Sequence, residues 1–262
     1  MVSEMSAEAG SADLHSLTLL VSTQRSGSTL LGRDIESLGG LGSPREHFRG
    51  FEAQAKLSRM SENDVVERLT LGVEKSARGV TAVKLQVQQL GSVCEAISGE
   101  RLPPSVKAVS TVVDWARERF DRVLLIVLVR NALDIAISRV IAHETGTYLS
   151  TKPVSRVAGG PLPLIDDLNA KVLNELETVL RHRAILKGVA AKYSDFALLL
   201  TYDELTGQVE ETTRRLVTHA HEHGFEPQGD TVTRKLEKLI SSEQADSIRE
   251  SFLDHLRNEP GI

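Results

Sequence analysis

The sequence predicts an α/β fold in which helices flank a central, mainly parallel sheet on both faces, giving three layers. Three apolar runs, rich in leucine and β-branched residues, lie at residues 17–23, 123–129 and 196–201. None of the three alternates between apolar and polar residues, which is typical of parallel strands that are covered on both faces. Segments with helical periodicity separate these runs, and strands that alternate with helices favour a parallel sheet.

The remaining elements follow in order along the chain. Residues 80–85, with β-branched side chains at three positions, are a weaker fourth strand. Helical patterns are predicted at residues 31–38, 53–74, 106–120, 132–144, 164–193 and 210–223. Ligands bind to such sheets beyond the carboxyl ends of the strands. Residues just after positions 23, 85, 129 and 201 are therefore the first candidates for a functional site.

Composition and charge narrow the class of protein. The 262 residues, 40% of them hydrophobic, suffice for one α/β core, and no repeat or linker divides them, so we expect a single domain at residues 15–262. Residues 1–14 are small and acidic and are expected to form a disordered tail rather than a signal peptide. The net charge of −5 argues against nucleic acid as a general partner.

Cysteine content and hydropathy indicate the compartment. Cys94 is the only cysteine, so no intrachain disulfide can form, and a reducing compartment fits best. Cys94 itself is expected at a buried helix position. No stretch approaches the roughly 20 apolar residues that cross a bilayer, so no transmembrane segment is expected. These observations together predict a cytoplasmic protein, with a homodimer left open.

A polar loop follows the first predicted strand and precedes a helix. It consists of Gln24, Arg25, Ser26, Gly27, Ser28 and Thr29. A strand, a tight polar loop and a helix form a cradle for anions, because a glycine lets the backbone come close and the helix N-terminus attracts negative charge. Ser28 or Thr29 is expected to cap the helix. A plain turn between strand and helix is the alternative, and the missing Gly-Lys-Ser/Thr unit argues against a nucleoside-triphosphate loop.

A second candidate element follows the strand at residues 123–129. Arg130, Asp134 and Ser138 are spaced four residues apart and would share one face of a helix. Asp134 is expected either to orient Arg130 or to cap the turn. The alternative is a simple ion pair of these two residues on the surface.

The loop and the segment at residues 130–138 resemble sulfotransferases that use 3′-phosphoadenylyl sulfate (PAPS), particularly the bacterial trehalose-sulfotransferase-like family. Three blocks, at residues 17–48, 123–144 and 196–205, carry this resemblance in the order that the family has them. It implies a P-loop-like three-layer fold and a transferase that uses PAPS as co-substrate. It also implies that residues 24–29 hold the 5′-phosphosulfate, and that Arg130 and Ser138 contact the 3′-phosphate.

The resemblance also indicates where a base would lie. Three glycines and Pro44 end the helix after the loop, so Glu46 and His47 are expected on a loop near the cradle. Attack by a hydroxyl on sulfur needs a base, and the Pro-x-Glu unit of the family favours Glu46. His47 is the competing candidate. Relatives also carry a lysine in the context of Lys84, which suggests that Lys84 steadies charge on the sulfuryl oxygens.

Other polar residues are expected to have ordinary structural roles. His219, His221 and His223 are interpreted as a solvated helix end, and no metal is expected because no set of ligands with the right spacing is present. The segment beginning Tyr202 resembles a family segment and is expected to pack and to cap a helix. Arg234 and Lys235 either close over the co-substrate or lie on a charged surface helix.

The sequence thus predicts a sulfotransferase that moves a sulfuryl group from PAPS to a hydroxyl of a small, carbohydrate-like acceptor. Arg25 and the loop amides would neutralise charge on the departing bisphosphate. A phosphotransferase that uses a nucleoside triphosphate, and a non-catalytic protein that binds a nucleotide or an anion, are the alternatives. Whether the acceptor is a sugar, a glycolipid or a natural-product alcohol stays open.

Overall fold

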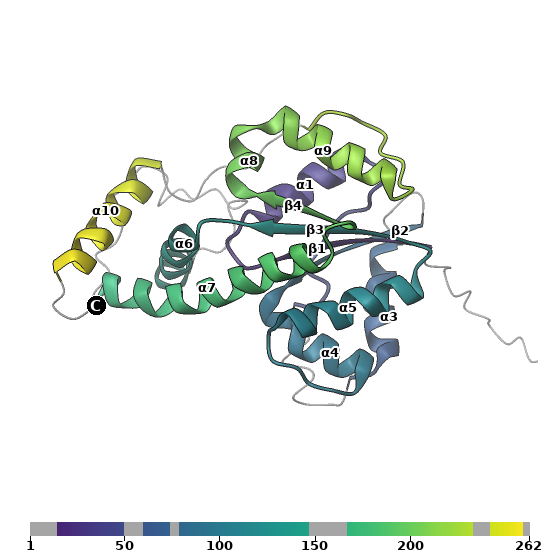
Figure 1. Ribbon diagram of the computed structural model, residues 1–262, viewed down its shortest axis with the longest axis horizontal. Coiled ribbons are helices and arrows are strands. Elements are labelled where there is room, and N and C mark those ends of the chain that lie inside the picture. The colour runs from purple at the N-terminus through teal and green to yellow at the C-terminus, as the bar shows by residue number, and fades with distance from the viewer. Residues whose placement is uncertain (1–14, 50–59, 74–78, 147–166, 233–241, 259–262) are drawn as a thin grey trace, which may run out of the picture.

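A central sheet of four strands forms the middle layer of the computed structural model, which describes residues 15–49, 60–73, 79–146, 167–232 and 242–258. The strands are β1 (Ser16–Ser22), β2 (Val80–Gln86), β3 (Arg122–Val129) and β4 (Ala197–Thr201). They lie in the order β2-β1-β3-β4, and each neighbouring pair is parallel (Figure 1). The predicted α/β fold is confirmed, and each strand lies within one residue of its expected bounds.

Both faces of the sheet are covered, in agreement with the lack of alternation in the strand sequences. Neighbouring residues of a strand enter different hydrophobic clusters. Leu19 and Leu125 belong to one cluster, whereas Leu20 and Ile126 belong to the other. Since side chains alternate between the two faces of a strand, both faces of β1 and β3 carry apolar packing.

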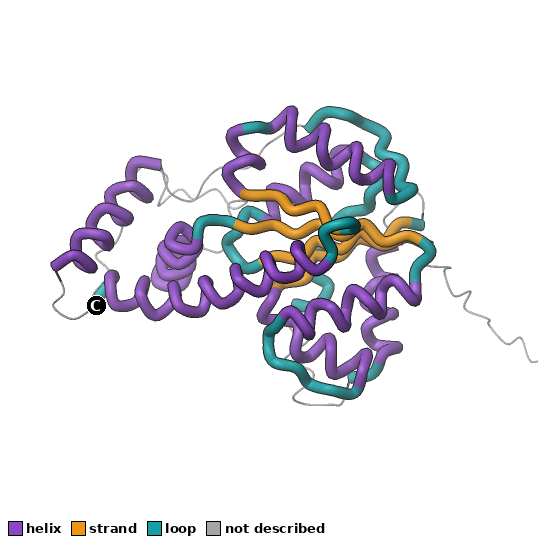
Figure 2. The backbone as a smooth tube through the Cα atoms, viewed as in Figure 1, coloured by secondary structure: helices purple, strands orange, loops and turns teal. Residues whose placement is uncertain are grey.

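Helices form the two outer layers, above and below the strands in Figure 2. One face packs against α1 (Ser28–Leu38) and α9 (Val209–Glu222), with the short α8 (Tyr202–Gly207) beside them. The other face packs against α3 (Glu62–Val73), α4 (Leu90–Ser98), α5 (Val106–Arg119) and the end of α7 (Leu168–Lys192). A short 3₁₀ helix, η1 (Val87–Gln89), joins β2 to α4.

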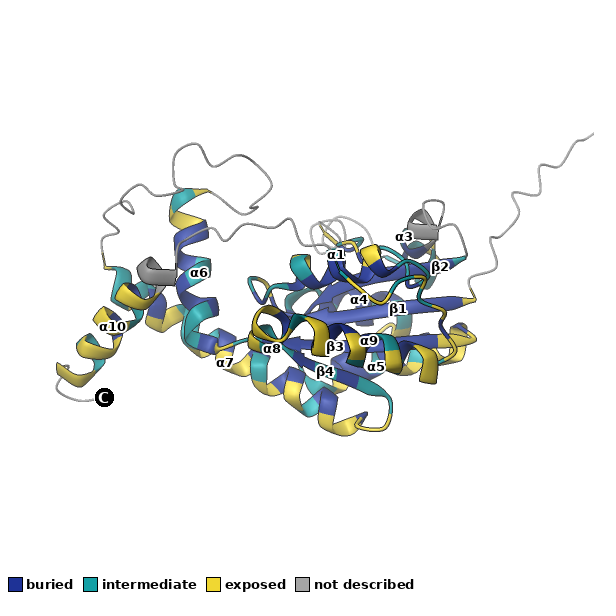
Figure 3. Cartoon of the chain, turned by 90° about the horizontal axis from the view of Figure 1, so that it is seen from above, coloured by how far each residue is buried: buried dark blue, intermediate teal, exposed yellow. Residues whose placement is uncertain are grey.

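Two further helices extend the molecule beyond the carboxyl end of β3. Helix α6 (Ala132–Thr145) follows β3 and packs along α7, and α10 (Ser242–Asn258) packs against α6, as the views in Figures 1 and 3 show. Phe252 of α10 is fully buried in a cluster that includes Ile137 of α6 and Val172 of α7. This packing places α10 near the start of α6, close to the candidate site residue Arg130.

The predicted helices are present, and three were not predicted. These three are α4, α8 and α10, which have 9, 6 and 17 residues. Cys94 is buried in α4, as expected of a helix residue. The tail at residues 1–14, the first part of the helix predicted at 53–74, and Arg234 and Lys235 lie outside the described residues. Among the helices that are described, none is long and apolar enough to cross a membrane.

Candidate active site

Polar residues from all four strand ends meet at the carboxyl edge of the sheet. Arg130, directly after β3, donates from Nη1 to the main-chain oxygen of Arg25 in the loop after β1 (3.2 Å). Lys84, near the end of β2, donates from Nζ to Oγ1 of Thr29 (3.2 Å). The guanidinium of Arg130 also lies 4.1 Å from the ring centroid of Tyr202, which follows β4. The loop after β1 is thus the centre to which the other strand ends connect.

This loop has the backbone geometry of an anion cradle. Gly27 is the N-cap residue of α1 with a φ of +94°, and Arg25 has a φ of +66°. A Cβ atom at Gly27 would collide with the Tyr202 ring, so both conformation and space require glycine. Ser28 and Thr29 do not cap α1 as expected, because they lie inside its first turn and no side chain caps the helix. The N–H groups of this turn and the helix dipole therefore favour an anion.

The loop residues differ in exposure. Ser26 is fully buried, and its Oγ has no hydrogen-bond partner among the residues that the structure describes. A buried hydroxyl that lacks a partner costs about 1–3 kcal/mol, which a bound oxyanion would recover. Ser28 is also buried, whereas Gln24 and Thr29 are exposed.

Arg25 joins the loop to the second candidate element. Its Nε donates to Oγ of Ser138 on α6 at 3.0 Å, so two segments 113 residues apart share a hydrogen bond. The pKa of Arg25 lies below its ordinary value, first because the side chain is buried and second because the charge of Arg130 is close. Two neighbouring guanidinium groups repel each other, and a shared anion would relieve that repulsion. The structure thus brings Arg25, Arg130 and Ser138 together.

Asp134 pairs with Arg130 only at long range and does not cap α6. Its Oδ2 lies 3.8 Å from Nη2 of Arg130, while its Oδ1 accepts a much shorter bond, 2.6 Å, from Nη2 of Arg249 on α10. The cap of α6 is Asn131, whose side-chain oxygen accepts from the first-turn amides. Asp134 therefore mainly anchors the C-terminal helix and makes a weak contact with Arg130.

Glu46 lies beside Lys84 at the end of β2. Its Oε1 forms an ion pair with Lys84 Nζ and accepts a hydrogen bond from Gln86 Nε2, both at 2.9 Å. The side chain of Lys84 is 8% exposed and that of Glu46 is 30% exposed. Within the described residues no donor lies on the other carboxylate oxygen, Oε2, of Glu46. A carboxylate that is positioned through one oxygen and has no donor on the other oxygen is suited to accept a proton on that second oxygen.

The ring of His47 is directed at the backbone of β2. Its Nε2 donates to the main-chain oxygen of Ala82 in β2 (3.2 Å), and its own main-chain oxygen accepts from Arg68 (2.7 Å). A ring nitrogen that donates a hydrogen bond already carries a proton. Nε2 of His47 is therefore unsuited to act as a base in this arrangement, which favours Glu46.

The family comparison covers the region that contains these residues. A model of the Stf0 sulphotransferase family matches residues 18–158, more than half of the chain. The protein belongs to the Stf0 sulphotransferase family. The matched segment includes most of β1, the cradle, Glu46, Lys84, Arg130 and the whole of α6. No curated protein matches the chain.

In this Stf0 family member, a buried group behind the cradle was missed by sequence reasoning. Thr23, the residue between β1 and the loop, accepts from Arg139 Nη2 at 2.6 Å and lies 3.3 Å from Nδ1 of His182. Burial lowers the pKa of His182 to about 4, and the charge of Arg139 adds to this effect, so the ring is neutral. Arg139 follows Ser138 directly, but no sequence pattern shows that it turns toward β1.

His219 of α9 and His223, directly after α9, lie at the amino end of β4, whereas the cradle lies at the carboxyl end of the sheet. The rings of His219 and His223 are in edge contact, 4.4 Å apart between centroids, and His223 also contacts Phe196. The side chain of His219 is only 13% exposed, so the interpretation of a solvated helix end is wrong for this residue. Burial, and then His223, lower its pKa. No group of three metal-binding side chains occurs in the part of the chain that the structure describes.

Proposed function

We propose that this Stf0 family member transfers a sulfuryl group from PAPS to a hydroxyl of a small, carbohydrate-like acceptor. The observation that carries the proposal is the hydrogen bond from Arg25 to Ser138, beside Arg130. It joins the anion cradle at the start of α1 to a second cationic element, which fits a ligand with two separate anionic groups. Family membership supplies the sulfuryl-transfer class.

The residues present fit the donor. The 5′-phosphosulfate would be held by the first-turn amides of α1 and by the buried hydroxyl of Ser26, which has no partner in the described structure. The 3′-phosphate would be held by Arg130 and Ser138. Ser138 accepts from Arg25 and still has its own proton to donate. Gln24 and Thr29, exposed at the loop surface, would line the cradle.

The donor supplies the sulfuryl group: a bond forms from the acceptor oxygen to sulfur, and the bond from sulfur to the phosphate oxygen breaks. Glu46 takes the acceptor proton on Oε2, because Oε1 is occupied by Lys84 and Gln86. Lys84 bridges Glu46 and Thr29, so its ammonium lies between the base and the cradle. There it stabilises negative charge on the sulfuryl oxygens.

Arg25 stabilises the departing bisphosphate. Its burial strengthens its interaction with an anion, since charges interact more strongly away from water. Loose transfer reactions of this kind depend mainly on positioning and charge stabilisation. We further propose a single domain at residues 15–262, a cytoplasmic location and a reaction that needs no metal.

A transfer assay with sulfur-labelled PAPS tests the proposal. The purified protein is incubated with labelled donor and either trehalose, a glycolipid or a simple alcohol, and labelled product is separated from the donor. Arg130→Ala should lower the rate of transfer at low donor concentration about 10- to 150-fold. Arg119→Ala, which removes an exposed arginine of α5 paired with Glu62, is the matched control and should behave as wild type.

Two other results would point to the alternative functions. Transfer of phosphate from labelled ATP, with none from PAPS, would make the protein a phosphotransferase. Tight binding of adenosine 3′,5′-bisphosphate without transfer to any acceptor would make it a non-catalytic nucleotide-binding protein.

A further inference from the structure

A network of five charged side chains connects the cradle to the C-terminal helix α10. Arg130 donates to the main-chain oxygen of Arg25 at 3.2 Å, and its Nη2 lies 3.8 Å from Oδ2 of Asp134. Arg249 of α10 donates to Asp134 at 2.6 Å and to Asp246 at 2.8 Å. This charge network therefore links the proposed phosphate site to a helix near the end of the chain.

The carboxylate of Asp134 has two guanidinium neighbours and is hydrogen-bonded to only one of them. Its Oδ1 accepts from Arg249, whereas its Oδ2 stays beyond hydrogen-bond distance of Arg130. If Asp134 accepted a short bond from Arg130 instead, a phosphate would have to displace that carboxylate before it could bind. Because Asp134 is directed at Arg249, Nη2 of Arg130 does not carry this competing bond.

The charges of the network are nearly balanced, so a single cation decides their sum. Three arginines and two aspartates leave one positive charge. The side chains of Arg130 and Asp134 are 21% and 17% exposed, so water and salt screen them only in part. Without Arg249 the sum would be zero, and the carboxylate of Asp134 would lack its closest partner. Both changes would weaken the attraction of the site for an anion.

Apolar packing holds α10 in place independently of this ion pair. Phe252 is fully buried, and Ile248, directly before Arg249, is 9% exposed. Both belong to a hydrophobic cluster with Ile137 of α6 and Val172 of α7. Removal of the Arg249 side chain should therefore leave the helix packed against α6, so an effect on ligand binding can be separated from an effect on the fold.

We propose that Arg249 is a positioning residue for the 3′-phosphate: it binds Asp134, keeps that carboxylate away from Arg130 and keeps the site positively charged. The proposal rests on the proposed function, since it takes Arg130 as the phosphate ligand. It gives the C-terminal helix a part in nucleotide affinity. The family match ends at residue 158, well before α10, so it assigns this helix no role.

Two variants that break the same ion pair should change nucleotide binding in different directions. Arg249→Ala leaves the carboxylate without its partner and should raise the Kd for adenosine 3′,5′-bisphosphate about 5- to 30-fold. Asp134→Asn removes the carboxylate and should bind the bisphosphate at least as tightly as wild type. A purely structural role of the ion pair would instead weaken binding in both variants.

Restoring the balance of charge should restore binding. The double variant Arg249→Ala/Asp134→Asn lacks both charges, and Arg249→Lys keeps both. Each should bind the bisphosphate within about 3-fold of the wild-type Kd. If loss of the Arg249 side chain acted through the fold, the double variant would bind no better than Arg249→Ala.

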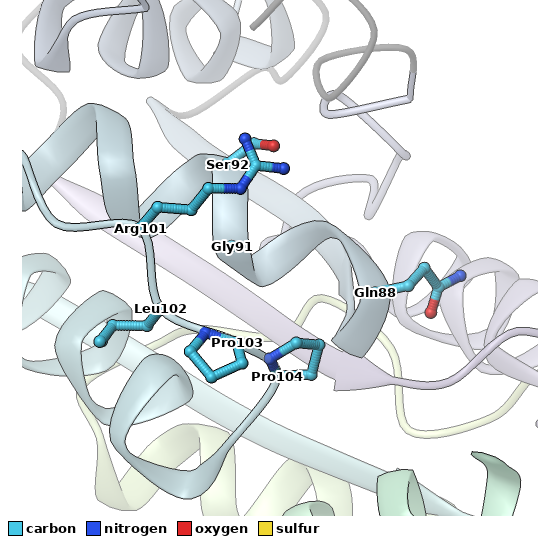
Figure 4. A pocket seen from close by; sticks show the side chains of 7 residues that line it. All are labelled: Gln88, Gly91, Ser92, Arg101, Leu102, Pro103 and Pro104. Carbon is cyan, nitrogen blue, oxygen red and sulfur yellow. The ribbon is translucent and has the colours of Figure 1, made fainter. Parts of the chain in front are cut away.

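Two other arginines provide controls. Arg257→Ala is the matched control, because Arg257 lies on the same helix and pairs with Asp254 at 2.8 Å. Arg101→Ala is the control at a distance in sequence. Arg101 pairs with Glu95 and lines a pocket at the start of α4 whose lining residues include no member of the charge network (Figure 4). Both variants should bind the bisphosphate as wild type does.

Isothermal titration calorimetry with the bisphosphate and with AMP measures these effects. AMP lacks the phosphate that Arg130 would hold, so its Kd should change by less than about 3-fold in Arg249→Ala. A loss of folded protein would weaken the binding of both nucleotides equally. Turnover of PAPS by the same variants is the second readout: in Arg249→Ala the KM for PAPS should rise while kcat stays unchanged.

The outcomes separate this proposal from the proposed function. If sulfuryl transfer occurs but Arg249→Ala binds both nucleotides as Arg257→Ala does, or Asp134→Asn weakens binding equally, the positioning role is wrong and the reaction stands. If no transfer occurs but the two variants differ as expected and the double variant recovers, the positioning role stands and the reaction is wrong. A wild-type protein that binds the bisphosphate no better than AMP overturns both.

Discussion

Replacing Glu46 by glutamine removes the proposed base with little change of shape. Glutamine can keep an oxygen at the position that contacts Lys84 and accepts from Gln86, but it cannot take a proton at the position of Oε2. Lost acid–base catalysis lowers rates by roughly 10²–10⁴, which corresponds to about 3 to 5 kcal/mol in the barrier. We expect kcat of Glu46→Gln to fall by that factor.

The same substitution should also lower the free energy of unfolding, and the contacts of Lys84 limit the size of this loss. Lys84, 8% exposed, loses the charge of its partner but keeps the hydroxyl of Thr29. Breaking a buried ion pair costs about 3–5 kcal/mol, and the partial exposure of Glu46 and the remaining contact reduce this to about 1–2 kcal/mol. The variant should therefore stay folded at 25 °C, so a loss of turnover would not reflect unfolding.

The assay measures initial rates at saturating donor and the affinity for adenosine 3′,5′-bisphosphate. Affinity should be nearly unchanged, because Glu46 does not belong to the cradle. Glu36→Gln is the matched control, since Glu36 also accepts two hydrogen bonds, from Ser43 and Arg45, and it should keep near-normal kcat. If His47→Gln is inactive while Glu46→Gln turns over normally, the assignment of the base is wrong.

Three further predictions concern a close contact at Gly27, the buried ring of His182 and the proposal that the reaction needs no metal. Gly27→Ala should lower the free energy of unfolding by about 1–3 kcal/mol more than Gly99→Ala does, because both have a positive φ but only Gly27 faces the Tyr202 ring; equal losses in urea unfolding would contradict this. His182 has a folded pKa of about 4 against 6.5 unfolded, so the unfolded chain binds the extra proton and stability falls, by up to about 3 kcal/mol, as the pH drops from 6.5 to 4. His182→Gln should lose less stability over this range than the exposed-site control His15→Gln, and an equal loss would mean that His182 is not the group responsible. Transfer activity should survive EDTA, and activity that EDTA abolishes and a divalent ion restores would show that a metal is required.

Strands β1 and β3 were predictable because strands buried on both faces consist largely of apolar residues. The segment at 123–129 contains only leucine, isoleucine and valine, and β3 is buried from Val123 onward. The cradle was also predictable, since a glycine in a short polar loop between a strand and a helix is typical of an anion-binding loop. Helices α4 and α8 escaped prediction because they are short, so few periods of apolar residues mark them.

The contacts of the candidate site were not predictable from spacing. Ser138 lies eight residues after Arg130, yet its hydrogen bond comes from Arg25, more than 100 residues earlier. Asp134 has the spacing of a partner for Arg130 but pairs at short distance with Arg249, because α10 packs onto α6. Such pairings depend on how helices pack in three dimensions, which the local sequence does not record.

The central claim is that Arg25, Arg130 and Ser138 form a site for a second phosphate. Isothermal titration calorimetry with adenosine 3′,5′-bisphosphate and AMP tests it most directly, since the two ligands differ by the 3′-phosphate alone. We expect the bisphosphate to bind on the order of 100-fold more tightly than AMP. Arg130→Ala should weaken its binding by about 1.5–3 kcal/mol and change AMP binding little, because a charge-assisted bond to phosphate is lost. Equal affinity of the wild-type protein for the two nucleotides would contradict the assignment.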